Sequence, residues 1–123
     1  MLTPTAAKEL GRAFRFFRHA GNLSLRDVAK RAGLSAQYVQ NIERGEKFNA
    51  STDVFTRLAR GYELPAAVID NLVLKAEVMS ALERRGLDQE SAEFIWRGVE
   101  QRLGEKGVEY RTDLVEVVST MIG

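Results

Sequence analysis

Cysteine is absent from this sequence, and histidine occurs once, as His19. Without cysteine the chain can form neither disulfide bonds nor a thiolate metal site, a composition typical of proteins in reducing compartments. The lone histidine has no evident catalytic partner, and no glycine-rich phosphate loop or cluster with catalytic or metal-ligand spacing occurs. We therefore expect a protein that is not an enzyme and that holds neither a cofactor nor a metal.

Long apolar runs are also missing. The longest, such as residues 66–69 and 72–74, are far shorter than the roughly 20 residues of a membrane-spanning helix. Met1 is not followed by a basic and then apolar leader, and we find no internal repeat or low-complexity tract. These features predict a soluble, cytoplasmic protein with no membrane partner.

The charge is unevenly divided along the chain. Residues 1–65 hold eleven Lys or Arg against six Asp or Glu, and residues 66–123 hold seven against eleven, although the whole chain carries only +1. A basic half beside an acidic half indicates that the first half meets a polyanion while the second has another task. Ordinary scatter of surface charge is the alternative on this feature alone.

Apolar periodicity and helix caps predict an all-α fold. The spacing favours a first helix over residues 5–20. Ser24 caps a short second helix that ends at Ala32, and Asp27 can return the hydrogen bond in a capping box. Gly33 follows where a tight corner between helices needs a residue that tolerates positive φ, and Ser35 can cap a third helix.

The later helices follow from the same signals. Ser51 or Thr52 caps a fourth helix, and the helix after Pro65 carries apolar residues on two flanks, as if covered on more than one side. The next helix begins near Asp88 and is broken by Gly104 and Gly107. A last helix is expected from Thr112, although its β-branched content leaves a strand possible.

The third helix carries unusual outward-facing residues. Val39 and Ile42 face the core, so the neighbouring positions project away from it: Ala36, Gln37, Gln40, Asn41 and Arg44. Asn and Gln can bond bidentately to adenine, and Ala can contact the thymine methyl group, in the major groove of DNA. The pattern favours a helix that reads DNA, against the alternative of solvated positions on an ordinary surface helix.

The run from Leu10 to Pro65 resembles the lambda-repressor-like, or xenobiotic-response-element type, helix-turn-helix regulators. Its most specific stretch, LSLRDVAKRAGLSAQYVQNIERGE, has the family's serine before the second helix, alanine within it, glycine corner, serine cap and Ile-Glu-x-Gly ending. The resemblance covers about half of the chain. It implies an N-terminal bundle of about five helices whose second and third helices bind DNA, in a sequence-specific regulator that acts as a dimer.

Residue roles implied by the resemblance fall into three groups. Base-reading positions are Ala36, Gln37 and Asn41, with Gln40 a further candidate. Positions expected at the DNA phosphates are Arg26, Ser35, Tyr38, Arg44 and Lys47. Arg18 and Glu43 match a pair that forms an internal salt bridge, which is a structural role.

Two departures from the family pattern affect these roles. Leu25 stands where the family often has a glutamine at a phosphate, so we expect Arg26 to take over that contact. Asn22 stands where glycine is frequent in the family, and we expect Gly21 to take the role of that glycine one residue earlier.

We therefore expect a helix-turn-helix domain over residues 1–65 and a helical region over residues 66–123 that mediates dimerisation. The apolar residues assigned to the dimer are Leu72, Met79, Trp96, Val99 and Val118, unless they simply complete the core of one subunit. The predicted function is a transcriptional repressor that binds a palindromic operator as a homodimer. The alternatives are an antitoxin whose second half holds a toxin, and a sensor with a small-molecule pocket in its C-terminal helices.

Overall fold

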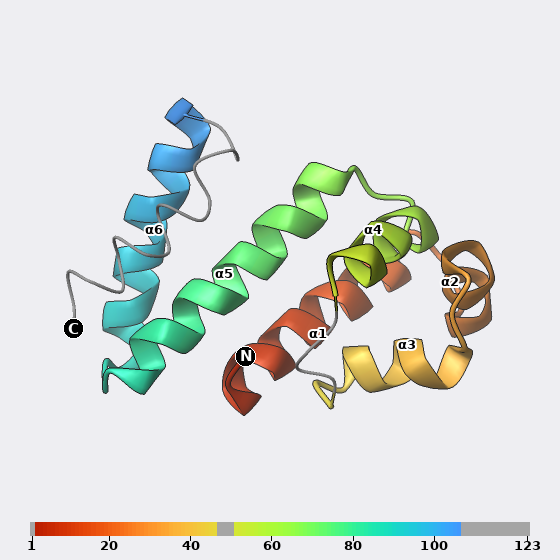
Figure 1. Ribbon diagram of the computed structural model, residues 1–123, viewed down its shortest axis with the longest axis horizontal. Coiled ribbons are helices and arrows are strands. Elements are labelled where there is room, and N and C mark those ends of the chain that lie inside the picture. Colours follow the sequence, from red (N-terminus) through yellow and green to blue (C-terminus); the bar gives the residue numbers. More distant parts are fainter. Residues whose placement is uncertain (1, 47–50, 107–123) are drawn as a thin grey trace.

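The computed structural model describes residues 2–46 and 51–106. Within these ranges the chain forms six α-helices and no strand, which confirms the predicted all-α fold. The helices are α1 (Pro4–Ala20), α2 (Leu25–Ala32), α3 (Ala36–Glu43), α4 (Thr52–Gly61), α5 (Ala66–Arg84) and α6 (Gln89–Lys106). Helices α1 to α4 gather on one side of the long α5, and α6 packs along its other side (Figure 1).

The helix ends follow from the capping residues. The hydroxyl of Thr3 accepts from the Ala6 N–H at 3.3 Å, so α1 begins at Pro4. Ser51 caps α4 in the same way. Helix α6 continues through Gly104 to Lys106, so Gly104 does not break it as predicted, because a glycine weakens a helix without necessarily ending it. Gly107, the second predicted break, lies outside the described residues. The helix expected from Thr112 lies outside the described residues.

A first hydrophobic core joins α1 to α4 with part of α5. Phe14, Leu58 and Ile69 are among its fully buried side chains. The ring of Phe14 stacks on that of Tyr62, with 5.1 Å between ring centroids. Because Ile69 belongs to α5, this helix is part of the wall that closes the N-terminal bundle.

A second core lies between α5 and α6. Leu74, Val78 and Leu82 of α5 meet Ala92 and Trp96 of α6 there. The two flanks of α5 therefore face two different cores, which confirms the prediction that this helix is covered on more than one side.

This second core contains two of the residues that the sequence assigned to the dimer. Trp96 and Val99 are only 3% and 5% exposed in the single chain, so they fill the core of their own subunit and offer little surface to a second copy. Leu72 and Met79 are half-buried, and Val118 lies outside the described residues. Periodicity identified the inward face of α6, and the burial of Trp96 and Val99 fits the alternative that they complete the core of one subunit.

Helix α3 rests directly on the backbone of α1. A Cβ added at Gly11 would lie 2.6 Å from the carbonyl oxygen of Ile42, and it would be closer still to that of Glu43. Any other residue at position 11 would push the two helices apart. The end of α3 is thus held against α1 with no side chain between them.

Candidate nucleic-acid interface

Three local devices set the ends of α2 and the start of α3. The side chain of Ser24 accepts from the Asp27 N–H at 3.0 Å, and Asp27 accepts in return from the Ser24 N–H at 2.9 Å, which closes the predicted capping box. Gly33 ends α2 in the left-handed conformation, with φ of 68°. The hydroxyl of Ser35 then accepts from the Tyr38 N–H at 3.0 Å and starts α3.

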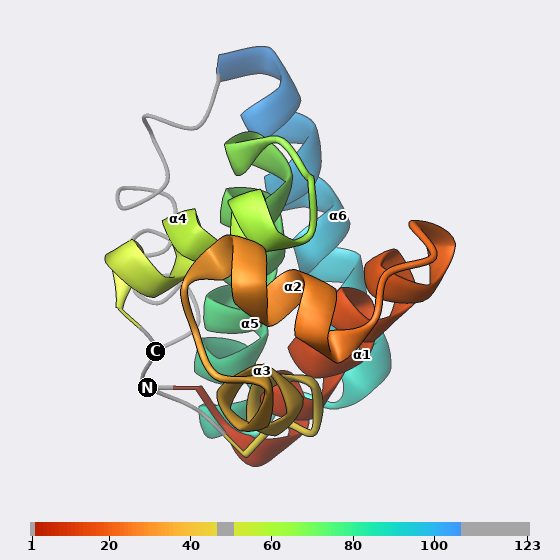
Figure 2. The ribbon, with the colours of Figure 1, turned by 90° about the vertical axis from the view of Figure 1, so that its right-hand side faces the viewer.

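The corner turns α3 onto the edge of the molecule. In the view onto α2, α3 lies along the lower edge of the bundle, as it does in the first view (Figures 1 and 2). Val39, Ile42 and Glu43 form its buried side. Gln37 and Arg44, on the opposite side of the helix, are exposed, while Gln40 and Asn41 are half-buried.

The outward amides of α3 contact each other. Gln37 Nε2 donates to Asn41 Oδ1 at 2.9 Å, one helical turn away. With the Asn41 amide turned over, its nitrogen instead lies 3.2 Å from Glu46 Oε2 and can donate to that carboxylate. We favour the turned-over amide, because its nitrogen then faces two acceptors, Glu46 Oε2 and the carbonyl oxygen of Gln37 at 3.3 Å, in place of the bond from Gln37 Nε2. In this orientation the Gln37 amide and the oxygen of Asn41 remain for a further partner.

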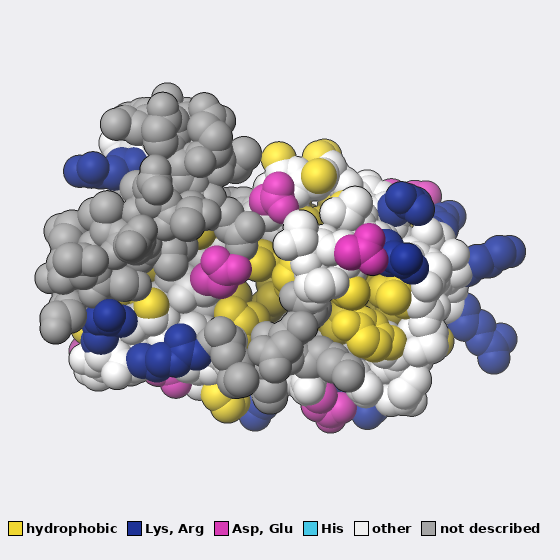
Figure 3. All heavy atoms as spheres, in the orientation of Figure 1, with side chains coloured by type: hydrophobic (Ala, Val, Ile, Leu, Met, Phe, Trp, Pro, Cys, Tyr) yellow, Lys and Arg dark blue, Asp and Glu magenta, His cyan; other side chains and the backbone are white. Residues whose placement is uncertain are grey.

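Other predicted DNA residues surround this amide pair. Arg26, Ser35 and Arg44 are exposed, and Lys and Arg side chains project from the end of the molecule that carries α2 (Figure 3). Ala36 and Tyr38 are half-buried and pack against the first core, so they present only part of their surface. Lys47 lies outside the described residues.

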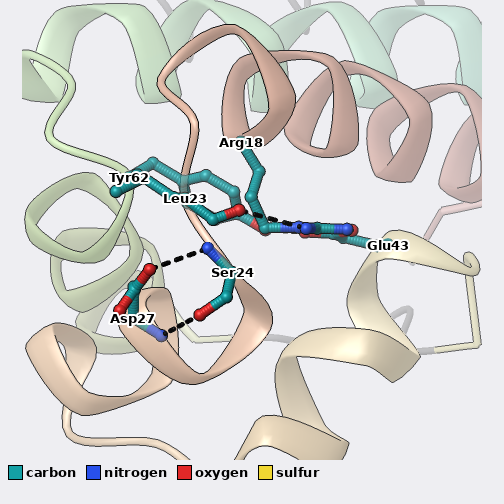
Figure 4. Close-up of polar contacts among 6 residues, drawn as sticks. All are labelled: Arg18, Leu23, Ser24, Asp27, Glu43 and Tyr62. Atoms are coloured by element: carbon teal, nitrogen blue, oxygen red, sulfur yellow. Dashed lines mark hydrogen bonds and ion pairs between the residues drawn. The ribbon is translucent and has the colours of Figure 1, made fainter.

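A buried polar triad fixes the end of α3 (Figure 4). The guanidinium of Arg18 donates from Nε to Glu43 Oε2 at 2.9 Å and from Nη2 to Oε1 at 3.0 Å, a two-pronged ion pair that the sequence predicted. The hydroxyl of Tyr62 donates to Glu43 Oε2 at 2.7 Å. The side chains of Arg18 and Glu43 are 13% and 5% exposed. Three helices, α1, α3 and α4 with its cap, therefore meet at one carboxylate.

The protonation states suit these roles. The hydrogen bond to Glu43 raises the pKa of Arg18, which keeps its guanidinium charged. Burial and the hydrogen bond to Glu43 raise the pKa of Tyr62 far above its usual value, so its hydroxyl remains a donor. At the surface, the backbone N–H of Ser24 lowers the pKa of Asp27.

The structure adds residues that the sequence did not indicate. Tyr62 is the first of these, and the available signal was that a tyrosine in a core position needs an acceptor for its hydroxyl. Arg57 Nη1 donates to the carbonyl of Gly33 at 3.3 Å and supports the corner from α4. Asn22 has φ of 55° while Gly21 has φ of −84°, so the expectation that Gly21 replaces the usual glycine is wrong. Asparagine tolerates the left-handed conformation well.

A helix pair with a left-handed glycine corner, an exposed third helix and an anchored end defines a helix-turn-helix unit. A family model described as "Helix-turn-helix domain" matches residues 9–72, more than half of the 123 residues. The chain belongs to this helix-turn-helix domain family, consistent with the lambda-repressor-like resemblance, and the family indicates DNA binding.

Searches of curated proteins and of solved structures returned no match to this chain. Across residues 2–46 and 51–106, no helix is long and apolar enough to cross a membrane. The same residues contain no group of three or more His, Asp or Glu placed to hold a metal ion.

The triad makes a prediction about stability. Tyr62→Phe removes one hydroxyl and leaves the ring in place, so we expect the free energy of unfolding to fall by about 1–3 kcal/mol, because the buried carboxylate loses a donor. Urea denaturation measures this change. Glu9→Gln, which breaks the exposed Arg12–Glu9 pair, is the control and should cost less than about 1 kcal/mol. Equal, small losses in both variants would contradict the anchoring role of Tyr62.

Proposed function

We propose that this protein is a sequence-specific transcriptional regulator that places α3 in the major groove of double-stranded DNA. The observation that carries the proposal is that the amides of Gln37 and Asn41 lie one helical turn apart on the outward side of a helix whose far end is anchored by Glu43. A rigidly held helix can present hydrogen-bonding groups to base edges at a defined position. Helix α3 has only eight residues, a length that fits the groove.

The contacts divide by their chemistry. Gln37 and Asn41 are the proposed base readers, with Gln40 beside them and Ala36 at the start of the helix. Amides suit adenine, which offers one donor and one acceptor in the major groove. Arg26, Arg44, Lys47, Tyr38 and the N-terminus of α3 at Ser35 are proposed to hold the phosphates, which set orientation without reading sequence.

One such unit covers only half of a typical binding site, so we propose that two copies bind a palindromic operator. Residues 1–65 would bind the DNA, and residues 66–123 would join the copies. Phe94 on α6 is 75% exposed, the highest value among the large apolar residues that are described, and it points away from the second core. It is therefore our candidate for the dimer contact, in place of Trp96 and Val99.

We propose that the protein represses transcription and does not activate it. A dimer bound at a promoter excludes RNA polymerase by occupying the site, and this needs no further contact surface. Selection of bound sequences from a random DNA pool would test the central proposal, because a two-fold symmetric consensus is expected. Failure to enrich any sequence would contradict base reading.

Base reading predicts a selective defect. Gln37→Ala or Asn41→Ala should weaken binding to the selected operator by about 1–3 kcal/mol and relax the preference at one base pair. Binding to random DNA should barely change. Fluorescence anisotropy on both DNAs measures the difference, with Gln89→Ala, another exposed helical glutamine far along the chain, as the control. Equal losses on operator and random DNA would rule out a base-reading role.

Phosphate contact predicts the opposite pattern. Arg44→Ala should weaken operator and random DNA alike, and it should reduce the slope of log affinity against log salt by about one unit per subunit. Arg85→Ala, which removes an exposed arginine at the end of α5, should leave the slope unchanged. A changed base preference with an unchanged slope would reverse the assignment of Arg44.

The dimer contact can be tested with the intact chain. We expect the chain to sediment as a dimer and Phe94→Glu to weaken association by roughly 2 kcal/mol or more, because a charge would enter an apolar contact. The side chain is exposed, so the fold should survive. Phe16→Glu on α1, where Phe16 is 68% exposed, is the matched control. A dimer that tolerates Phe94→Glu but not Phe16→Glu would move the interface to α1.

A further inference from the structure

A groove of about 320 Å³ lies between α1, α5 and the first turn of α6. This volume is at the lower end of the range for small-molecule sites. Leu10, Leu72, Ala76 and Met79 supply apolar lining from α1 and α5, and Leu87 and Ala92 add to it near α6. Leu72 and Met79, which the sequence assigned to a dimer, thus border a concave site within one chain.

The rim of the groove carries charges of both signs, but they are not balanced. Arg12 pairs with Glu9 at 2.7 Å, and Lys75 pairs with Glu93 at 3.5 Å. These pairs use both cations that line the groove. The remaining carboxylates, Glu83 and Asp88, lie where α5 ends and α6 begins.

Glu83 and Asp88 have only neutral donors in the described part of the chain. Thr3 Oγ1 donates to Glu83 Oε2 at 2.6 Å, and the Ser91 N–H donates to Asp88 Oδ1 at 2.8 Å. The hydrogen bond from the Ser91 backbone also lowers the pKa of Asp88, which keeps it ionised. Glu83 stands in the last turn of α5, where the helix dipole adds further negative potential. One end of an apolar groove therefore carries two carboxylates that form no ion pair with a described residue.

We propose that this groove binds a small organic cation with an apolar body. The cationic group would lie between Glu83 and Asp88, and the body would cover Leu72 and Met79. Charge complementarity selects a cation over a neutral or anionic molecule of the same shape, and the limited volume selects a body of one or two rings.

The groove and the DNA-reading helix share α1. Leu10 and Ala13 face the groove, while Gly11 between them supports the end of α3. A molecule that moves α1 relative to α5 would therefore shift the surface of α1 on which the end of α3 rests. On this basis the cation is an effector that changes affinity for DNA, a consequence that rests on the proposed function.

Three probes that differ only in the charge of the head group test the site: naphthylmethylamine, naphthylmethanol and naphthoate. Calorimetry on the intact chain without DNA should give the amine an affinity at least about tenfold above that of the alcohol. The naphthoate should bind more weakly than the alcohol. The methyl resonances of Leu72 and Met79 should shift with the amine. Equal affinities, or no binding by any probe, would overturn the proposal.

Variants test whether Glu83 and Asp88 are the residues that select a positively charged ligand. Glu83→Gln combined with Asp88→Asn keeps the shape of both side chains and the cap of α6. It should reduce the affinity for the amine about tenfold and leave that for the alcohol unchanged. Glu100→Gln, which removes an exposed carboxylate of α6 outside the groove lining, is the control.

Ala13→Leu should fill the groove and abolish binding of all probes. If it instead changes the sedimentation of the chain without affecting the probes, the groove is a contact between two copies and the proposal fails.

The effect on DNA is measured separately. Saturating naphthylmethylamine should change the affinity of the wild-type chain for its selected operator and should not change that of the Ala13→Leu variant. Unchanged operator affinity on the wild type would overturn the effector role. Because the probes are first titrated without DNA, a chain that binds amine but selects no DNA would refute the proposed function and leave the groove assignment standing.

Discussion

The carboxylate of Glu43 is the constraint on which the geometry of α3 depends. It lies at the last residue of α3 and receives hydrogen bonds from Nε and Nη2 of Arg18 on α1 and from the hydroxyl of Tyr62 at the end of α4. Burying an ion pair carries a large desolvation penalty, and its attraction repays that penalty only when the remaining hydrogen-bonding positions are filled. Tyr62 and the carbonyl of Leu23, which accepts from Arg18 at 3.2 Å, fill them here.

This arrangement is better suited to fixing the orientation of α3 than to stabilising the fold. Apolar side chains of similar size could hold the three helices together, but they would tolerate small rotations of α3. A two-pronged ion pair has a narrow range of acceptable geometries. The direct contact between Gly11 and the end of α3 restricts the same helix in translation. Together they leave the outward face of α3 in one position relative to the bundle.

The sequence predicted the local features of this fold because their signals are local. Ser24 with Asp27, Gly33 and Ser35 each act within a few residues, and the structure has each of them in the expected role. Asn22 was misjudged because both Asn and Gly tolerate a left-handed backbone. Only the path of the chain determines which of two neighbouring residues adopts that conformation. Trp96 shows the limit of periodicity, which identifies an inward face without identifying what covers it. The approach of Gly11 to α3 depends on residues more than thirty positions apart, and no spacing rule indicates it.

The separation of the anchored and exposed sides of α3 has an evolutionary consequence. Val39, Ile42 and Glu43 attach the helix to the bundle, whereas Gln37 and Asn41 do not contribute to either hydrophobic core. Substitutions on the exposed side can therefore accumulate at little expense to folding. If α3 reads DNA as we propose, a few exchanges on this side would change the recognised sequence and leave the attachment of the helix to the bundle intact.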